Sequence, residues 1–190
     1  MRTRHAGAAL ALAVLAMGCE SNDQLLEPVG SPSLAVGAVE AAASGGGQAV
    51  LPAGFSELKF SFTATALANG KAVGQFRQVY VSGSGRVDFH GRVTCVSVDA
   101  ANGRAWIGGV ITKNNSTNPN TMLPIHQVGE EVWFRVLDDG EGDGAVDRTT
   151  VLGFRGGAGI ITSAEYCATV PWRDNNAFTW PVVSGNIQVR

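Results

Sequence analysis

The stretch LKFSFTATALANGKAVGQFRQVYVS, residues 58–82, decides the fold class. In its first half, Phe60 and Phe62 alternate with polar neighbours, the period-two pattern of a strand with one buried and one wet face. The Asn-Gly pair at 69–70 follows, and both residue types tolerate the positive φ angles of a tight hairpin turn. The chain then returns as a second strand. This stretch therefore predicts an antiparallel β-hairpin.

The same signals repeat downstream. A second Asn-Gly pair, at 102–103, separates two further strand-like runs, and a shift of apolar phase near Cys95 predicts a β-bulge there. The other runs with strand character are EVWFRVLDD (131–139), TTVLGF (149–154), GIITSAEYCATV (159–170) and NIQVR (186–190). Short turns join these runs, and no helix-length periodic segment separates them. The sequence predicts an all-β antiparallel meander of about seven to nine strands, closing into a small barrel or sandwich.

Composition agrees with one such domain plus extensions. The chain has 190 residues, of which 45% are hydrophobic and 16% charged, and its 25 glycines disfavour a helical bundle. The formal net charge of −2 gives no electrostatic footprint for nucleic acid, so no nucleic-acid partner is expected.

The N-terminus has the pattern of an export signal. Arg2 and Arg4 precede an uncharged run, residues 6–17, that is too short to span a bilayer as a helix. LAMGC, residues 15–19, then resembles the lipobox of bacterial lipoproteins, although Ala16 stands where that pattern has an aliphatic residue. The resemblance covers about the first twenty residues of the chain.

The lipobox resemblance implies removal of residues 1–18 and attachment of lipid to Cys19. The protein would then be exported and anchored to a bacterial cell membrane or outer membrane, with that membrane as its partner. An ordinary secretory signal is the alternative, and it would leave Cys19 as a free thiol. Residues 19–50 are rich in Ala, Gly, Ser and Pro and are expected to be a flexible tether, followed by a single β-domain at 51–190.

If Cys19 carries lipid, Cys95 and Cys167 remain as an even pair. In the oxidising environment that export implies, two such cysteines more often pair than stay free, so a Cys95–Cys167 disulfide is expected. The alternatives are two buried thiols that pack as small hydrophobes and, less favoured, a catalytic cysteine.

A second resemblance spans Phe60 to Phe154. The series F-x-G-x-V-T-C-x-x-V, NG-x-A-x-I-G-G and W-F-R-V-x-D-x-G-E-G-D is similar to uncharacterised secreted or surface bacterial β-domains that carry a D-x-G-E-x-G-D hairpin. That resemblance implies a β fold and an exported location, and it implies no reaction.

The acidic stretch LDDGEGDGAVD, residues 137–147, offers a candidate calcium site. It places Asp139, Glu141, Asp143 and Asp147 at positions 1, 3, 5 and 9 of an EF-hand-like count. The count fails at position 12, which is Thr150 rather than a bidentate Glu. A solvated acidic hairpin loop is the alternative. No other cofactor is indicated.

Catalytic signatures are missing from the sequence. Beyond the export signal only His90 and His126 remain as histidines, and no GxSxG elbow, HExxH pair or phosphate-binding glycine loop occurs. An enzyme is therefore not expected.

The tryptophans leave two interpretations. Trp106 and Trp133 lie opposite the main apolar face of their strands, and we expect them to pack in a second core layer or against the C-terminal segment. Trp172 and Trp180 share one irregular stretch, residues 171–183, which is a candidate surface for a protein or glycan partner. The expected function is a non-enzymatic, lipid-anchored interaction or structural module. The alternatives are a small-ligand carrier built on a barrel and a hydrolase of unrecognised type.

Overall fold

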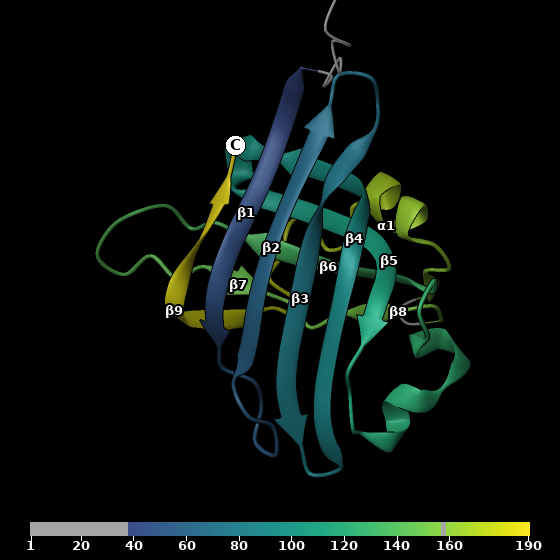
Figure 1. Cartoon of the computed structure of the whole chain (residues 1–190). Helices are drawn as coiled ribbons and strands as arrows, with labels where there is room; N and C mark the ends of the chain where they lie inside the picture. The colour runs from purple at the N-terminus through teal and green to yellow at the C-terminus, as the bar shows by residue number, and fades with distance from the viewer. Residues whose placement is uncertain (1–37, 157–158) are drawn as a thin grey trace, which may run out of the picture. The chain divides into compact units, whose positions relative to one another are not determined.

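The computed structural model describes residues 38–156 and 159–190, and strands dominate this part of the chain (Figure 1). The strands are β1 (Val39–Ala49), β2 (Leu58–Leu67), β3 (Ala72–Ser82), β4 (Gly85–Asp99), β5 (Arg104–Asn114), β6 (Glu131–Leu137), β7 (Arg148–Thr149), β8 (Gly153–Phe154) and β9 (Trp180–Val189). The helical elements are α1 (Ser163–Thr169) and short 3₁₀ helices at Ala100–Asn102, Pro119–Met122 and Pro124–His126.

All the strands belong to one antiparallel sheet that closes on itself. The order is β5-β4-β3-β2-β1-β9-β7-β6-β8, and β5 pairs with β6 as well as with β4, so the pairings form a ring. The ring is not a regular barrel, because β7 supplies only two residues and β8 branches off β6. The predicted all-β class, the antiparallel meander and the strand number are confirmed.

Phenylalanine rings fill the interior of the ring. Phe134 of β6 packs edge-on against Phe62 and against Phe76, with ring centroids 5.5 Å apart in both pairs. Room for Phe76 comes from Gly91, where a Cβ atom would lie 1.9 Å from the end of the phenylalanine ring. The long predicted hairpins therefore wrap a dry aromatic core, and the glycine inside β4 permits the close approach.

The predicted tether boundary at residue 51 is wrong for the part of the tether that the structure describes. Residues 39–49 form β1, which pairs with β2 on one side and β9 on the other. A Cβ at Gly45 would lie 2.8 Å from the carbonyl oxygen of Asn186, so glycine lets β9 approach. The small residues that are typical of a flexible spacer therefore also occur in a strand that packs closely against its neighbours. The predicted signal at 1–18, Cys19 and the tether up to residue 37 lie outside the described residues.

The prediction of a strand over 159–170 is also wrong, because residues 163–169 form helix α1. The Thr162 hydroxyl accepts a hydrogen bond from the Glu165 amide, and the Glu165 carboxylate accepts one from the Ile161 amide. These reciprocal bonds resemble a capping box, which satisfies amides that a helix start leaves free. The short T-x-x-E signal decides the local structure, while the apolar run GII does not.

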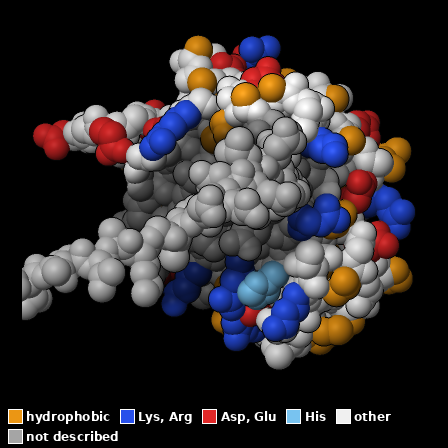
Figure 2. All heavy atoms as spheres, turned by 45° about the horizontal axis from the view of Figure 1, so that its top comes forward, with side chains coloured by type: hydrophobic (Ala, Val, Ile, Leu, Met, Phe, Trp, Pro, Cys, Tyr) orange, Lys and Arg blue, Asp and Glu red, His pale blue; other side chains and the backbone are white. Residues whose placement is uncertain are grey.

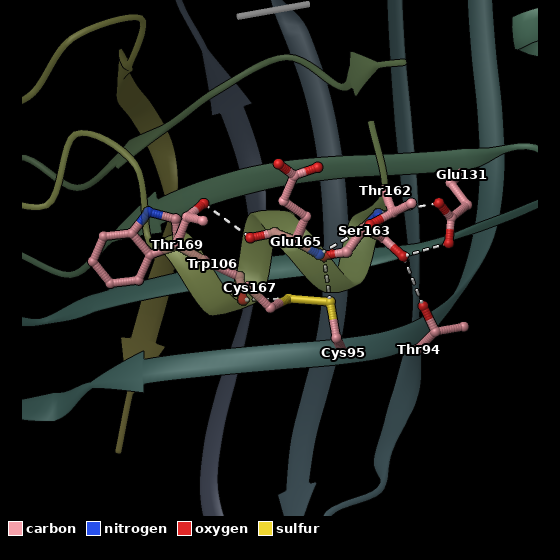
Figure 3. Close-up of a disulfide and its surroundings, with 9 residues drawn as sticks. All are labelled: Thr94, Cys95, Trp106, Glu131, Thr162, Ser163, Glu165, Cys167 and Thr169. Atoms are coloured by element: carbon pink, nitrogen blue, oxygen red, sulfur yellow. Dashed lines mark hydrogen bonds between the residues drawn. A yellow bond between two sulfur atoms is a disulfide. The ribbon is translucent and has the colours of Figure 1, made fainter. Parts of the chain in front are cut away.

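The Cys95–Cys167 disulfide ties α1 to the outer face of β4 (Figure 3). The expected bulge is present, since the β4–β5 register shifts between Val93 and Cys95. Under the helix, a second apolar cluster forms from Trp106, Trp133, Ile160 and Tyr166. The expected packing of Trp106 and Trp133 in a second layer is confirmed.

No helix in the described part of the chain combines the length and the apolar character needed to cross a bilayer.

Candidate functional site

An aromatic groove lies on the outer face of the ring, beside α1. We use this name for the cavity of about 350 Å³ between Trp133, Tyr166, Trp172 and Phe178, with residues 150–153 along it. Trp133 comes from β6 and Tyr166 from α1, while Trp172 and Phe178 come from the segment that joins α1 to β9. Four separate parts of the chain, residues 150–153 included, therefore build one concave apolar surface.

The four rings form two pairs. Trp133 and Tyr166 are buried and stacked, with centroids 5.8 Å apart and planes 23° from parallel. Trp172 and Phe178 meet edge to face at 5.1 Å, and Phe178 is 66% exposed. One side of the groove is thus fixed in the apolar cluster, and the other presents an aromatic ring to solvent.

Arg135 holds the segment that carries the outer pair. Its side chain is fully buried on the outward face of β6, and its guanidinium donates hydrogen bonds to the carbonyls of Pro171, Trp172 and Ala177. The guanidinium carbon lies 6.0 Å from the centre of the Trp172 ring, within cation–π range. Burial lowers the pKa of Arg135 from its ordinary value. A buried cation balanced by carbonyls fixes the path of residues 171–177.

The same segment contains all the non-glycine residues with positive φ in the described part of the chain. These are Val170 (41°), Trp172 (56°) and Phe178 (60°). Val170 ends α1, where its amide bonds to the Tyr166 carbonyl. A bulky residue in this region carries strain of about 1–3 kcal/mol, and such strain concentrates at ligand clamps and active sites. Two of the strained residues are the outer aromatic rings of the groove.

The structure separates the two tryptophans of the predicted surface. Trp172 lines the aromatic groove, whereas Trp180 lines a different cavity of about 180 Å³ beside Leu51 and Tyr80. Sequence proximity suggested one surface for both. Phe178 takes the place in the groove that the sequence assigned to Trp180.

The predicted calcium ligands do not converge. Asp147 is buried and accepts hydrogen bonds from the Asp139 and Ile187 amides, and Glu141 accepts one from the Asn186 side chain. Burial raises the pKa of Asp147. In residues 38–156 and 159–190, no three His, Cys, Asp or Glu side chains lie close enough to hold a metal ion. Asp143 is exposed, and calcium binding by this loop stays a prediction.

The histidines lie on different surfaces. His126 Nδ1 lies 2.8 Å from the Asn120 carbonyl oxygen, and His90 Nε2 lies 3.5 Å from Asp88. Burial lowers the pKa of both imidazoles. Within the described residues neither histidine hydrogen-bonds a serine, threonine or cysteine side chain.

Sequence reasoning missed Arg135, Tyr166 and Phe178. One signal for Arg135 was present: in the run VWFRVL it shares the face of Trp133, which the alternation places away from the phenylalanine core. When a strand face carries both a charged residue and a tryptophan, another segment of the chain is expected to pack over that face. Nothing in the sequence alone placed Phe178 beside Trp172.

Comparison with known proteins finds no matching family model, curated protein or solved structure.

Proposed function

We propose that this chain is an exported, lipid-anchored and non-enzymatic recognition module of the bacterial cell envelope, and that its aromatic groove binds a sugar ring of a glycan. The observation that carries the proposal is the pair of strained aromatic residues, Trp172 and Phe178, held over the groove by Arg135. Strain of this kind persists only where the surrounding structure enforces it.

The groove suits a flat ligand with one apolar face. Its volume of about 350 Å³ lies in the lower part of the range of small-ligand clefts, roughly 300–1,000 Å³. The C–H face of a sugar ring packs against aromatic rings, and Trp172 with Phe178 offers such a surface. Thr150 also lies along the groove, where its hydroxyl accepts a hydrogen bond from the Arg135 amide.

The test is a titration of intrinsic tryptophan fluorescence with tetrasaccharides of N-acetylglucosamine and of glucose. We expect Phe178→Ala to weaken binding about tenfold, because an exposed ring is lost without disturbing the core. Phe55→Ala is the matched control, since Phe55 is also an exposed phenylalanine but lies outside the groove. If neither sugar changes the fluorescence while a proline-rich peptide does, the glycan assignment is wrong.

The anchor has its own test, the intact mass of the protein recovered from membranes. Loss of residues 1–18 together with added acyl chains on Cys19 is the expected result, because a lipobox-type signal leaves an acylated N-terminal cysteine. Cys19→Ser should return the protein to the soluble fraction. An unmodified Cys19 in the membrane-bound protein would contradict the anchor.

A small-ligand carrier is the second candidate, and one cavity favours it. At one mouth of the ring, a space of about 390 Å³ opens between Tyr80, Phe89, His126 and Phe154. An apolar fluorescent probe such as anilinonaphthalene sulfonate should bind there. Ser84→Trp, which adds bulk at an exposed position of the lining, should displace it. If the fluorescence of the probe changed with neither the native protein nor Ser84→Trp, the carrier function would be excluded.

A further inference from the structure

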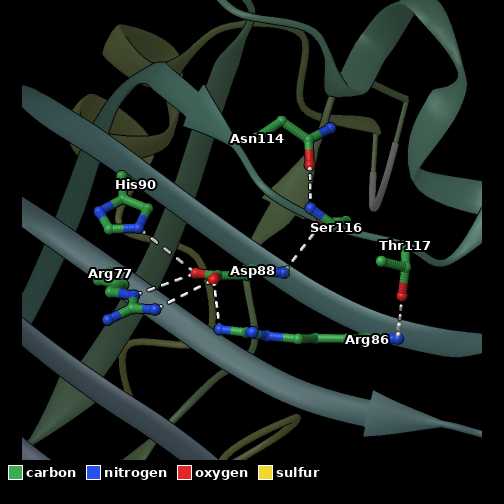
Figure 4. A network of polar contacts seen from close by, with 7 residues as sticks. All are labelled: Arg77, Arg86, Asp88, His90, Asn114, Ser116 and Thr117. Carbon is green, nitrogen blue, oxygen red and sulfur yellow. Dashed lines mark hydrogen bonds and ion pairs between the residues drawn. The ribbon is translucent and has the colours of Figure 1, made fainter.

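The outer face of β3 and β4 carries a buried carboxylate beneath exposed cations (Figure 4). The Asp88 side chain is 2% exposed and accepts hydrogen bonds from Nε and Nη2 of Arg77, at 3.0 Å each, and from Nη2 of Arg86, at 2.6 Å. Both arginine side chains remain nearly half exposed. One negative charge is therefore shared by two guanidinium groups.

The surrounding contacts fix this carboxylate. The Asp88 amide donates to the Ser116 hydroxyl, and the Arg86 amide donates to the Thr117 hydroxyl. These bonds hold the loop after β5 against β4. The carboxylate orients both arginines, while Arg77 Nη1 and the Nε and Nη1 groups of Arg86 donate no hydrogen bond to a described residue. The guanidinium groups are thus oriented, with donors left over.

A concave surface of about 540 Å³ lies beside this cluster. Its lining includes Lys59, Arg77 and Arg86, the hydroxyl residues Ser56 and Ser61, and one exposed carboxylate, Glu57. We call this surface the cationic pocket. Figure 2 shows Lys and Arg side chains gathered around a histidine on one face of the domain. The pocket contrasts with the net charge of −2 for the whole chain.

We propose that the cationic pocket binds a phosphate group. Arginine forks match the geometry of phosphate oxygens, and a carboxylate held behind the guanidinium groups pre-orients them for such contacts. The hydroxyl of Ser61 adds a neutral donor at the same surface, whereas the Ser56 hydroxyl already donates to the Glu57 carbonyl. The phosphate can belong to a small soluble ester or to a lipid headgroup, and the experiment separates these sources.

The soluble arm is calorimetric titration of the purified protein with inorganic pyrophosphate and with glucose 6-phosphate at low ionic strength. We expect Arg77→Gln and Arg86→Gln each to weaken binding about tenfold, since each removes a charge-assisted contact. Lys71→Gln, which removes an exposed charge in the β2–β3 turn outside the pocket, should change affinity less than about twofold.

Glu57→Gln adds a prediction of tighter binding, which a folding defect could not produce. Removing this exposed carboxylate from the pocket should tighten phosphate binding about threefold, because a repulsive charge is lost. A purely structural Arg–Asp–Arg network would not produce this gain. Thermal unfolding of every variant reports whether the weakened ones remain folded.

The lipid arm is co-sedimentation with vesicles of phosphatidylcholine, with and without phosphatidylglycerol. Any lipid anchor contributes equally to both, so preferential binding to the anionic vesicles, lost in Arg77→Gln, assigns the phosphate to a headgroup. Binding of the free phosphates alone assigns it to a soluble ester. The proposal is overturned if no phosphate probe binds, or if Lys71→Gln weakens binding as much as the pocket variants.

Discussion

Gly108 shows how one residue decides whether α1 can dock. A Cβ at this position of β5 would lie 2.5 Å from the Cys95 sulfur and 2.7 Å from Cβ of Ser163 in the helix. Neither neighbour can withdraw easily, because the disulfide ties the helix to β4. We predict that Gly108→Ala lowers the free energy of unfolding by about 2 kcal/mol, measured by urea denaturation.

Gly83→Ala is the control for that substitution. A Cβ at Gly83 would have no heavy atom within 4 Å, and the residue lacks a positive φ, so alanine should leave the unfolding midpoint unchanged. Equal losses at the two glycines would contradict the steric argument.

Arg135 makes the second residue-scale prediction. Arg135→Met leaves the carbonyls of Trp172 and Ala177 without this donor, while the Pro171 carbonyl keeps the hydrogen bond from the Trp106 indole. We expect the free energy of unfolding to fall by about 3 kcal/mol, because hydrogen bonds to a charged donor are lost in a buried place. Arg173→Met, an exposed neighbour paired with Asp99, should cost less than about 0.5 kcal/mol in the same urea experiment. If Arg135→Met were as stable as the native protein, residues 171–177 would keep their conformation without the Arg135 hydrogen bonds.

Asp88 predicts a pH dependence of stability. Burial alone would raise its pKa, but the hydrogen bonds from Arg77 and the charges of Arg77, Arg86 and His90 outweigh burial and lower it. A carboxylate with a lowered folded pKa stabilises the protein above its unfolded value, about 3.9, and this contribution is lost as pH falls through the folded pKa.

Asp88→Asn should therefore be less stable than the native protein at about pH 7 and should lose less stability on acidification to about pH 3. Urea unfolding at the two pH values measures both effects. Parallel losses in the two proteins would mean that Asp88 contributes nothing to the acid response.

At the scale of elements, the sequence predicts what local periodicity encodes. The hairpin of residues 58–82 appears as β2 and β3, joined at Asn69-Gly70, because alternation and turn chemistry agree there. Residues 159–170 lack such agreement: their apolar run favours a strand, while Thr162 and Glu165 favour a helix start. The capping residues prevail because the disulfide and the second apolar cluster hold a helix at this place.

Thr162→Ala tests the capping argument. The hydroxyl that accepts from the Glu165 amide is lost, and the free energy of unfolding should fall by about 1 kcal/mol. Thr169→Ala removes a hydroxyl at the other end of the same helix, where it donates to the Glu165 carbonyl, and should cost less than half as much. A larger effect at Thr169 would show that the cap does not set the helix.

At the scale of the whole molecule, closure was expected, but the strand pairs that close the ring and the candidate site lay beyond local reasoning. Closure joins β1 to β9 across most of the chain, and the aromatic groove joins β6, α1 and the segment before β9. Such contacts depend on which strands pair with each other, and the hydrophobic pattern within a strand does not specify its partner. Trp172 could be singled out because it lies in an irregular stretch with a second tryptophan, whereas its partners Phe178, Tyr166 and Arg135 required the closed ring.

The closure also corrects the domain boundary and gives the last prediction. A chain that starts at residue 51 lacks β1, which pairs with both β2 and β9, so two unpaired edges and the phenylalanine core would face solvent. A chain that starts at residue 38 keeps every described strand. We expect the longer chain to unfold in urea in one transition at the midpoint of the full-length protein, and the shorter one to show no cooperative transition and to aggregate. If the shorter chain unfolded cooperatively at the full-length midpoint, β1 would be an addition to the domain, and the spacer composition of residues 39–49 would have been the correct guide.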